Sequence, residues 1–442
     1  MTPPGSPEEA AALLDGLRSA GTELASRPIR ELIRVLGSAG NRFLDPEDPL
    51  RQKAEAALPE EAGLSPPMVR AVVEGMARDW TAPRLEALVE ADFRDPGVLD
   101  GFRPGPRGEL LRAMGGTLAF HIGAGSVPGV GAMSLLRSLL VKCPVLLKPG
   151  RGDVTLPTLL ARAIAESDPG LARALAVVYW PGEDGGTLED LALREASRVV
   201  VYGGTETVRA LRSRIPATTP LVAYHHRWSM GAVARERLTA AVSARRTATD
   251  AAMAVAVFDQ RGCVSPQVIW VEEGGEIDPL GWARLLAKEL EALEASLPPG
   301  PVDAGTAAAV HQLRGTSEIR GIAGSGEEVL AGKGVSWTVL YEPDPKPLPS
   351  CLSRTVRVKP VEALERIPEL LVPFAPVLQT LAVEATRTRR EALAEGLARS
   401  GITRITTFRD QPWPPAWWRH DGTGPLQALV RWISLEGQSE VD

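Results

Sequence analysis

Between residues 115 and 257, short apolar runs alternate with segments of helical periodicity. Four runs have the valine-rich or leucine-rich character of buried strands: 145–147, 176–180, 199–202 and 220–223. Segments with apolar residues at three- to four-residue spacing lie between them: 155–166, 188–195 and a stretch that opens near 205. This alternation is typical of a parallel sheet built from βαβ units, in which ligands bind at the carboxyl ends of the strands. The chain is therefore predicted to be an α/β protein.

The regions on either side of this segment have a different character. Residues 7–99 are rich in Ala, Leu, Glu and Arg and predict several amphipathic helices without recognisable chemistry. A second α/β segment is predicted to follow, with a strand AVAVF, a loop DQRGCVSP, a strand QVIWVE and a helix over 280–297. We expect four parts, namely a helical segment, two α/β domains and a C-terminal tail, with these bounds: 1–100, 101–255, 256–400 and 401–442.

Composition excludes several classes of protein. With 44% hydrophobic and 24% charged residues, the 442-residue chain is not expected to be disordered, and a net charge of −6 argues against a dedicated nucleic-acid binder. No stretch approaches 18 consecutive apolar residues, so no membrane span is expected. The N-terminus lacks the pattern of a secretory signal. The three cysteines are odd in number and far apart, which favours a reducing compartment, and the protein is expected to be cytoplasmic.

Cys263 is the leading candidate for a nucleophile. It lies in a loop with Gly and Pro nearby, predicted to connect two strands, where a thiolate can be exposed and stabilised by a neighbour such as Arg261. The alternative is that Cys263 is a small buried hydrophobic residue. Cys143 and Cys351 lie in or beside apolar strands, and for them the buried, unreactive role is the prediction.

Polar groups follow two of the predicted strands. Lys148 ends the run VLLK and can reach a ribose or a phosphate, although a solvated strand end is the alternative. Gly203, Gly204 and Thr205 open a helix after VVVY, where free amides and the helix dipole favour a phosphate. Arg151 could add positive charge for a 2′-phosphate.

The histidines and a glycine-rich loop give weaker signals. His225 and His226 follow the strand PLVAY and could supply a general base or a thiolate partner, with a polar turn as the alternative. The loop GAGSVPGVG misses the GxGxxG register of a dinucleotide-binding fingerprint. The other histidines are isolated and lack metal-ligand spacing, so no metal site is predicted: His121, His311 and His420.

The order of the motifs resembles a known family. The chain is similar to the LuxC-type acyl-CoA reductases of the aldehyde dehydrogenase superfamily from about residue 110 to 435. The resemblance is carried by seven segments in order: IGAGSVPG, VLLKPG, VVYWPGED, VVVYGGTETV, FDQRGCVSPQ, PVLQT and WWRHDG. It implies an aldehyde-dehydrogenase-like α/β fold with an N-terminal helical segment. Residues 101–255 would form an NADP-binding domain, residues 256–400 a catalytic domain, and residues 401–442 would return to the cofactor domain or to a subunit interface.

The resemblance also assigns roles to single residues. Cys263 matches the catalytic thiol and Lys148 the lysine that holds the adenosine ribose, while the turn that begins at Gly203 matches the pyrophosphate site. Three positions depart from the superfamily pattern. Ser126 replaces an asparagine of the oxyanion hole, Val372 replaces a glutamate that steadies the nicotinamide ribose, and His226 falls nearest to the missing general-base glutamate. Because hydride transfer needs no base to activate water, the missing glutamate favours reduction over oxidation.

The implied reaction is NADPH-dependent reduction of a fatty acyl thioester to an aldehyde through an S-acyl intermediate on Cys263. The acyl group would come from acyl-CoA or an acyl carrier, and an acyl-activating synthetase or transferase is an expected partner. A homo-oligomer is expected from the superfamily. Two alternatives remain: a non-redox acyltransferase or thioesterase that uses the same cysteine, and an acyl-binding partner protein.

Overall fold

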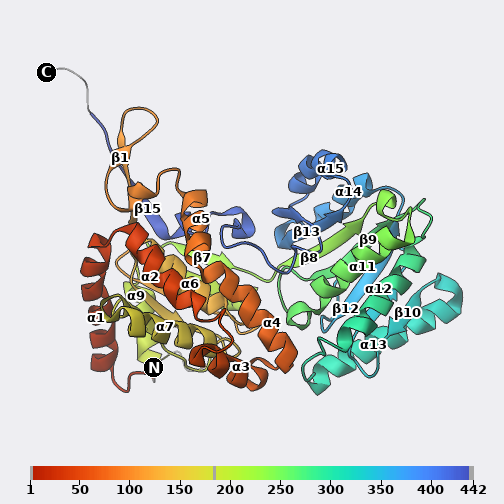
Figure 1. Ribbon diagram of the computed structural model, residues 1–442, viewed down its shortest axis with the longest axis horizontal. Coiled ribbons are helices and arrows are strands. Elements are labelled where there is room, and N and C mark those ends of the chain that lie inside the picture. Colours follow the sequence, from red (N-terminus) through yellow and green to blue (C-terminus); the bar gives the residue numbers. More distant parts are fainter. Residues whose placement is uncertain (1–2, 183–185, 438–442) are drawn as a thin grey trace. The chain divides into compact units, whose positions relative to one another are not determined.

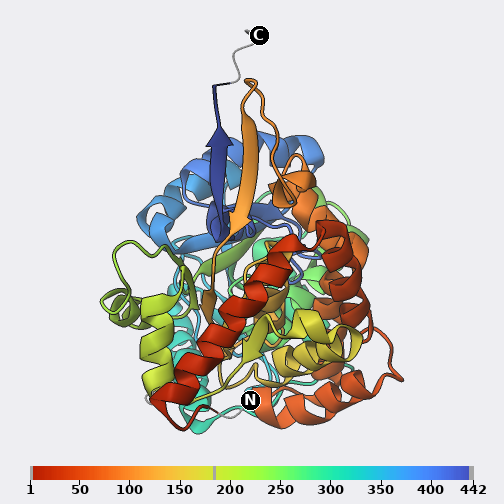
Figure 2. The same cartoon turned by 90° about the vertical axis from the view of Figure 1, so that its left-hand side faces the viewer.

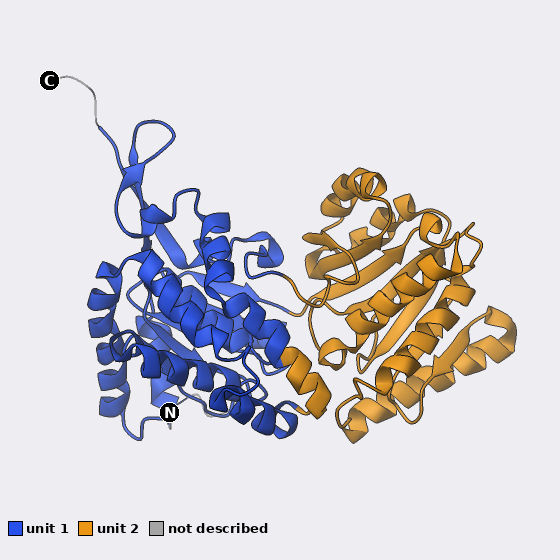
Figure 3. Ribbon diagram, in the orientation of Figure 1, with its two compact units in different colours: residues 1–62, 73–225, 415–442 blue, residues 63–72, 226–414 orange. Residues whose placement is uncertain are grey.

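The computed structural model describes residues 3–182 and 186–437, so Glu183 and Asp184 of the WPGED segment lie outside the described residues. Contacts divide the chain into two compact units (Figure 3). Unit 1 comprises residues 1–62, 73–225 and 415–442, and unit 2 comprises residues 63–72 and 226–414. The chain passes into unit 2 at residue 226, earlier than the expected boundary at 255/256, because strand β8 (Trp228–Val233) already pairs within the sheet of unit 2.

The N-terminal region is helical, as predicted. It contains five α-helices: α1 (Pro7–Ser26), α2 (Ile29–Asn41), α3 (Pro49–Ala62), α4 (Pro66–Ala77) and α5 (Ala82–Asp92). The hydroxyl of Ser6 caps α1 by accepting a hydrogen bond from the amide of Glu9. Buried residues at three- and four-residue spacing, including Ala10, Leu14 and Leu17, form the apolar face of α1. This face packs in the same hydrophobic cluster as the strands of the unit 1 sheet.

Unit 1 is built on a five-stranded parallel sheet (Figure 1). The strand order is β5-β4-β3-β6-β7, and the strands are β3 (Ala119–Ile122), β4 (Val145–Lys148), β5 (Leu175–Val177), β6 (Arg198–Tyr202) and β7 (Leu221–Tyr224). The helices that alternate with these strands are α6 (Val130–Leu140), α7 (Thr155–Ser167), α8 (Pro169–Ala172), α9 (Gly186–Glu195) and α10 (Thr205–Arg212). The chain runs outward from β3 to β5 and then returns to the other side of β3. The carboxyl ends of β3 and β6 therefore border a topological switch point, where α/β proteins bind ligands.

A second, antiparallel sheet in unit 1 joins the C-terminal strand to the segment that follows the N-terminal helices. It has the order β1-β2-β15, with β1 (Arg103–Pro104), β2 (Leu110–Gly115) and β15 (Val430–Leu435). Figure 2 shows β2 and β15 side by side, with Val430 opposite Gly115 and Leu435 opposite Leu110. The C-terminal region is thus divided, because residues 401–414 belong to unit 2 and residues from 415 onward belong to unit 1.

Unit 2 contains a seven-stranded sheet in the order β10-β11-β12-β9-β8-β13-β14. Only the β10–β11 pair is antiparallel. Besides β8, the strands are β9 (Pro266–Glu272), β10 (Glu328–Ala331), β11 (Thr338–Tyr341), β12 (Thr355–Val361), β13 (Leu378–Glu384) and β14 (Arg404–Thr406). The helices are α11 (Ala241–Ala256), α12 (Pro279–Glu294), α13 (Ala304–Arg320), α14 (Ile367–Leu371) and α15 (Arg387–Arg399).

Strand β9 lies in the middle of this sheet and is buried on both faces. Ile269 and Val271 point into a cluster with α11 and α12, whereas Val268 and Trp270 point into a cluster with α14 and α15. Such a strand is held firmly in place, so residues at its two ends have fixed positions.

One predicted element is wrong. The segment AVAVF was expected to form a strand, but residues 254–256 are the last turn of α11, and a short 3₁₀ segment, Val257–Gln260, follows. Alanine recurs at helical spacing through α11, for example at Ala244, Ala248 and Ala251, and all three are fully buried. Small side chains let this helix pack closely, and alanine is the best helix former, so the helical period outweighs the local alternation.

Among the described residues, no helix is both long and apolar enough to cross a membrane.

Candidate active site

Cys263 lies on a tight turn directly before β9. The amide of Ser265 donates to the carbonyl of Gly262 at 3.0 Å, which closes a four-residue turn with Cys263 at its second position. The hydroxyl of Ser229 on β8 donates to the carbonyl of Cys263 at 2.6 Å. The side chain of Cys263 is half-buried, and its backbone is held by these two hydrogen bonds. The predicted loop position of Cys263 is confirmed, but a 3₁₀ segment and not a strand precedes it.

Arg404 is a cation near Cys263 that the sequence analysis missed. The guanidinium donates to the carbonyls of Asp410 and Gln411 at 2.7 and 2.9 Å. Burial lowers the pKa of Arg404 to about 10, while attractions to Asp410 and to Cys263 oppose that shift. Arg404 is therefore a positively charged group that interacts electrostatically with Cys263. No motif marks Arg404, and 141 residues separate it from Cys263, so sequence inspection had no signal for this pairing.

Arg261, the expected neighbour of the thiol, contacts the segment that precedes Cys263. Its guanidinium donates to the backbone carbonyls of Phe258 and Gly63, each at 3.2 Å, and lies 3.8 Å from the carboxylate of Asp259. Burial lowers the pKa of Arg261. These contacts give Arg261 a role in holding the segment before Cys263.

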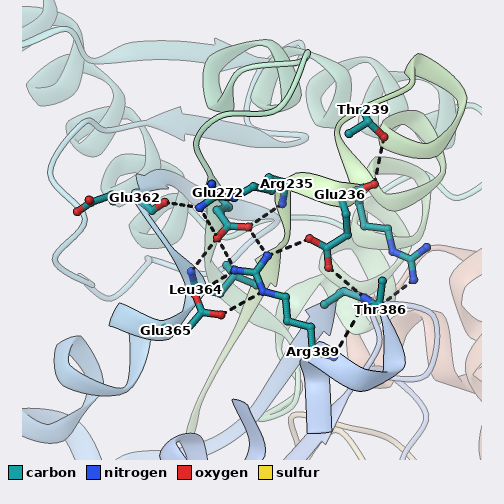
Figure 4. Close-up of polar contacts among 11 residues, drawn as sticks. Arg235, Glu236, Thr239, Glu272, Glu362, Leu364, Glu365, Thr386 and Arg389 are labelled. Carbon is teal, nitrogen blue, oxygen red and sulfur yellow. Dashed lines mark hydrogen bonds and ion pairs between the residues drawn. The ribbon is translucent and has the colours of Figure 1, made fainter. Parts of the chain in front are cut away.

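The opposite end of β9 is closed by ion pairs (Figure 4). The fully buried carboxylate of Glu272 accepts hydrogen bonds from both terminal nitrogens of Arg389, at 2.5 and 2.7 Å, and from the amide and guanidinium of Arg235. Burial by itself would raise the pKa of Glu272, but the bonds from Arg389 and Arg235 outweigh it and lower the pKa to about 2. Glu236 and Glu365 also accept from Arg389. Both carboxylate oxygens of Glu272, at the carboxyl end of β9, are therefore engaged in hydrogen bonds. The candidate reactive side chain of this strand, Cys263, lies at its amino end.

In unit 1, Lys148 is the last residue of β4, at the carboxyl edge of the sheet. Its ammonium lies 5.9 Å from the ring centroid of Trp180, whose indole N–H donates to Glu189 at 2.9 Å. Burial lowers the pKa of Lys148, and attraction to Glu189 opposes the shift. Lys148 is thus a half-buried cation at the edge where a parallel sheet binds ligands.

Ser126 is exposed, in the glycine-rich loop between β3 and α6. This loop packs closely against the loop after Lys148, because a Cβ atom on Gly150 would lie 2.2 Å from the amide nitrogen of Gly125. The buried carboxylate of Asp153 accepts hydrogen bonds from the amides of Gly129 and Gly131, both at 2.7 Å. Burial raises the pKa of Asp153 to about 8, although these two bonds oppose the shift. Asp153 therefore occupies the N-terminus of α6.

The N-terminus of α10 differs from those of its neighbours. Glu61 accepts from the first amides of α7, just as Asp153 does for α6, but no side chain caps α10, which begins at Thr205 after Gly203 and Gly204. Backbone amides and the helix dipole favour an anion at this N-terminus. Arg151, exposed in the loop after Lys148, is at the same edge of the sheet.

An aromatic stack also lies at this edge. Tyr202 and Tyr224 end neighbouring strands with ring centroids 4.7 Å apart. His420 stacks on Tyr224 at 4.3 Å and lies tilted against Trp418 at 4.6 Å. Burial raises the pKa of Tyr224. The segment WWRHDG therefore contributes to the carboxyl edge of the unit 1 sheet, and the C-terminal tail was expected to return to the cofactor domain or to a subunit interface.

The remaining predicted residues have varied positions. His226 is exposed and is the first residue of the long segment of unit 2, and Val372 is also exposed. Cys143 is buried, as predicted, and burial raises its pKa to about 12. Cys351 was expected to be buried but is half-buried, and it lines an open cavity of about 410 Å³ beside α13.

Unit 1 thus brings together Ser126, Lys148, Arg151 and the turn 203–205 at one edge of its sheet, whereas Cys263 and His226 belong to unit 2. Within the described parts of the chain, no group of His, Cys, Asp and Glu side chains is arranged to hold a metal ion.

The fold is that of the aldehyde dehydrogenases. The chain is similar to an NAD-dependent benzaldehyde dehydrogenase from Corynebacterium glutamicum, with a TM-score of 0.70 and 14% identity over 98% of this chain and 91% of that one. It is also similar to an NADP-dependent glyceraldehyde-3-phosphate dehydrogenase from Bacillus halodurans, with a TM-score of 0.70 and 14% identity over 97% and 91% of the two chains.

Residues 24–432 match the model of the acyl-CoA reductase (LuxC) family, and the chain belongs to this family. Its relatives include the long-chain acyl-protein thioester reductase of Aliivibrio fischeri, which is 26% identical over 92% of this chain and 82% of the relative. The long-chain acyl-protein thioester reductase of Vibrio harveyi is 23% identical over 92% of this chain and 83% of its own length.

Proposed function

We propose that the protein reduces a long-chain acyl thioester to the aldehyde with NADPH, through an S-acyl intermediate on Cys263. One observation carries the proposal: in a member of the acyl-CoA reductase family, a half-buried cysteine lies on a turn whose backbone is held by a hydrogen bond from Ser229 of β8. The names of the relatives support a long-chain acyl thioester as the substrate class.

The first step is acyl transfer to the protein. The thiolate of Cys263, favoured by Arg404, forms a bond to the acyl carbonyl carbon. The bond from that carbon to the donor sulfur then breaks, and the donor leaves as a thiol after taking up a proton. Ser126 and the amide of Cys263 are the proposed oxyanion donors, and the loss of one such donor costs on the order of 10²–10³ in rate.

NADPH is the proposed cofactor, and the residues of unit 1 fit a dinucleotide. Lys148 would hold the ribose, the uncapped turn Gly203, Gly204 and Thr205 would hold the pyrophosphate, and Arg151 would meet a 2′-phosphate. When bound, NADPH supplies the hydride by which the S-acyl group leaves as an aldehyde and the Cys263 thiolate is restored. His226 stands nearest to the position of a water-activating base, which hydride transfer does not need.

The acyl donor is proposed to be acyl-CoA or an acyl group carried on a protein, as the names of the relatives suggest. An acyl-activating synthetase or transferase is the proposed partner. We also propose that the protein forms a homo-oligomer.

The test is a spectrophotometric assay of NADPH oxidation at 340 nm with tetradecanoyl-CoA, together with chromatographic detection of tetradecanal and free CoA. Cys263→Ala should abolish both products. Cys351→Ala, which changes the other half-buried cysteine of unit 2, should leave the rate within twofold. Release of CoA without NADPH oxidation would contradict the reductase and indicate an acyltransferase or thioesterase. Aldehyde formation by Cys263→Ala would contradict the role of this cysteine.

A further inference from the structure

Two short runs of unit 2 adopt a backbone that L-amino acids avoid. Of the eight non-glycine residues with positive φ in the described part of the chain, six fall in two runs of three: Phe258, Asp259 and Gln260 (φ 56°, 50° and 64°) and Leu352, Ser353 and Arg354 (φ 63°, 55° and 54°). In this left-handed conformation, the Cβ atom of each residue crowds a carbonyl oxygen. Three such residues in a row persist only where surrounding contacts hold them.

An ion pair joins the two runs. The guanidinium of Arg354 donates from Nε to the carboxylate of Asp259 at 2.8 Å, and its Nη2 lies 2.7 Å from the same oxygen. Both residues are buried, with relative exposures of 2% for Arg354 and 9% for Asp259. Arg354 also donates to the carbonyl of Leu297, and the other oxygen of Asp259 accepts from the amide of Gly300. The ion pair is therefore also tied to the backbone at Leu297 and Gly300.

The side-chain amide of Gln260 makes a second connection. Its oxygen accepts from the amide of Thr355 at 2.8 Å, and its nitrogen donates to the carbonyl of Thr355 at 2.9 Å and to that of Pro266 at 2.8 Å. Gln260 is fully buried. The bond to Pro266 closes a loop over residues 260–266, and Cys263 lies at the middle of that loop.

The two runs lie next to each other at the amino ends of the neighbouring strands β9 and β12. The run that ends at Gln260 leads into Cys263 and β9, and the run that ends at Arg354 leads into β12, which pairs in parallel with β9. On the other side, Ser229 holds the carbonyl of Cys263 and accepts from the amide of Thr380 at 3.2 Å. The loop of Cys263 is thus tied to β8, β9, β12 and β13.

We propose that Asp259, Gln260 and Arg354 are positioning residues that hold the 260–266 loop in a strained conformation and thereby set the thiol of Cys263 for attack on the acyl thioester. This rests on the proposed function. The strained backbone relaxes if the contacts are removed, because right-handed and extended conformations are favoured for these residues. The relaxation moves Cys263, which is three residues from Gln260.

The test compares Arg354→Met, which removes the ion pair, with Arg354→Lys, which keeps the charge. The rate constant for S-acylation of Cys263 by tetradecanoyl-CoA is measured in a single turnover by peptide mass spectrometry. We expect Arg354→Met to acylate at least tenfold more slowly at saturation, with the half-saturating concentration of acyl-CoA changed less than threefold. In Arg354→Lys, the logarithm of the acylation rate constant should fall by no more than half as much as in Arg354→Met. NADPH affinity, which depends on unit 1, should be unchanged.

A folded Arg354→Met variant that acylates at the wild-type rate would overturn the proposal, even if its melting temperature fell, because the contacts would then only stabilise the unit. Should that variant not fold, Gln260→Glu serves the same purpose. It keeps the shape and the acceptor for the Thr355 amide but loses the donor to the carbonyls of Pro266 and Thr355. A folded Gln260→Glu variant is expected to show the same loss of acylation, and an unchanged rate would overturn the proposal.

A second readout separates this proposal from the proposed function. Alkylation of Cys263 by iodoacetamide at a fixed pH needs no acyl substrate and no NADPH. If the wild-type protein is not acylated, the proposed function fails, and the positioning is judged by alkylation alone. A change of at least threefold in the alkylation rate of the folded variant supports the proposal, whereas equal rates for variant and wild type overturn it.

Discussion

Cys263 and Glu272 lie at opposite ends of the same strand, since Cys263 precedes the first residue of β9 by three positions and Glu272 is its last residue. One end holds an accessible thiol on a strained loop, and the other holds a fully buried carboxylate bound by Arg389 and Arg235. Strand β9 is central and buried on both faces. The ion pairs of Glu272 therefore hold in place the same strand that follows Cys263.

The first prediction concerns the stability of the closed end. Glu272→Gln should lower the free energy of unfolding by about 3 kcal/mol, because the buried carboxylate loses the charge that Arg389 and Arg235 stabilise. The measurement is denaturant-induced unfolding of the full chain at pH 7. Glu362→Gln is the matched control, since the side chain of Glu362 is 75% exposed, and it should change stability by less than about 0.5 kcal/mol. Equal effects of the two substitutions would contradict the prediction.

The second prediction concerns how the stability that Glu272 provides depends on pH. The pKa of Glu272, about 2 in the folded protein, lies below its ordinary value of 4.5, so its stabilisation is complete above pH 4.5 and is lost as the pH falls toward 2. The full effect is on the order of 3 kcal/mol. The difference in unfolding free energy between wild type and Glu272→Gln should therefore narrow by at least about 1 kcal/mol between pH 6 and pH 3. A difference that does not depend on pH would show that Glu272 does not titrate in this way.

The third prediction concerns Arg404 and the thiol. Removing a cation disfavours the thiolate, so Arg404→Met should move the pH profile of Cys263 alkylation to higher pH. Arg404→Lys keeps a charge and should give a smaller shift. Alkylation is followed by peptide mass spectrometry from pH 6 to 10. Coincident profiles for wild type and Arg404→Met would exclude an electrostatic role for this residue.

The fourth prediction tests the left-handed run at Ser353. Glycine tolerates this conformation, so Ser353→Gly should raise the free energy of unfolding by about 0.5–1 kcal/mol, because relief of crowding outweighs the added entropy of the unfolded chain. Ala295→Gly, at an exposed right-handed position just after α12 in the same unit, should lower it by about 0.4–1 kcal/mol. Destabilisation by both substitutions would argue against the left-handed backbone.

The fifth prediction concerns Lys148. Lys148→Ala should weaken NADPH binding at least tenfold, which corresponds to about 1.4 kcal/mol, and should leave Cys263 acylation within twofold. Lys53→Ala, an exposed lysine of α3 in unit 1, is the control and should change neither quantity. NADPH affinity is measured by fluorescence titration. Unchanged affinity in Lys148→Ala would remove Lys148 from the cofactor site.

Much of the fold could be predicted from local patterns. The strands and helices of unit 1 follow the expected alternation, and the N-terminal helices follow their apolar spacing, because both periodicities are written in neighbouring residues. The prediction of a strand for AVAVF was wrong because it used only local residues. A five-residue window shows alternation, whereas the helix in which the segment begins extends over sixteen residues, Ala241–Ala256. Strand β8 was missed because its neighbours in the sheet, β9 and β13, come later in the chain.

The sequence by itself determined which residues could carry chemistry and at which strand ends they stand, because residue type and position along a strand are local properties. Cys263, Lys148 and the turn 203–205 were found in this way. Only the tertiary structure decided which of their neighbours act on them. The association of Cys263 with Arg404 and the tie between Gln260 and Thr355 join residues about a hundred or more positions apart, so their energies depend on distances that the chain acquires only when it folds.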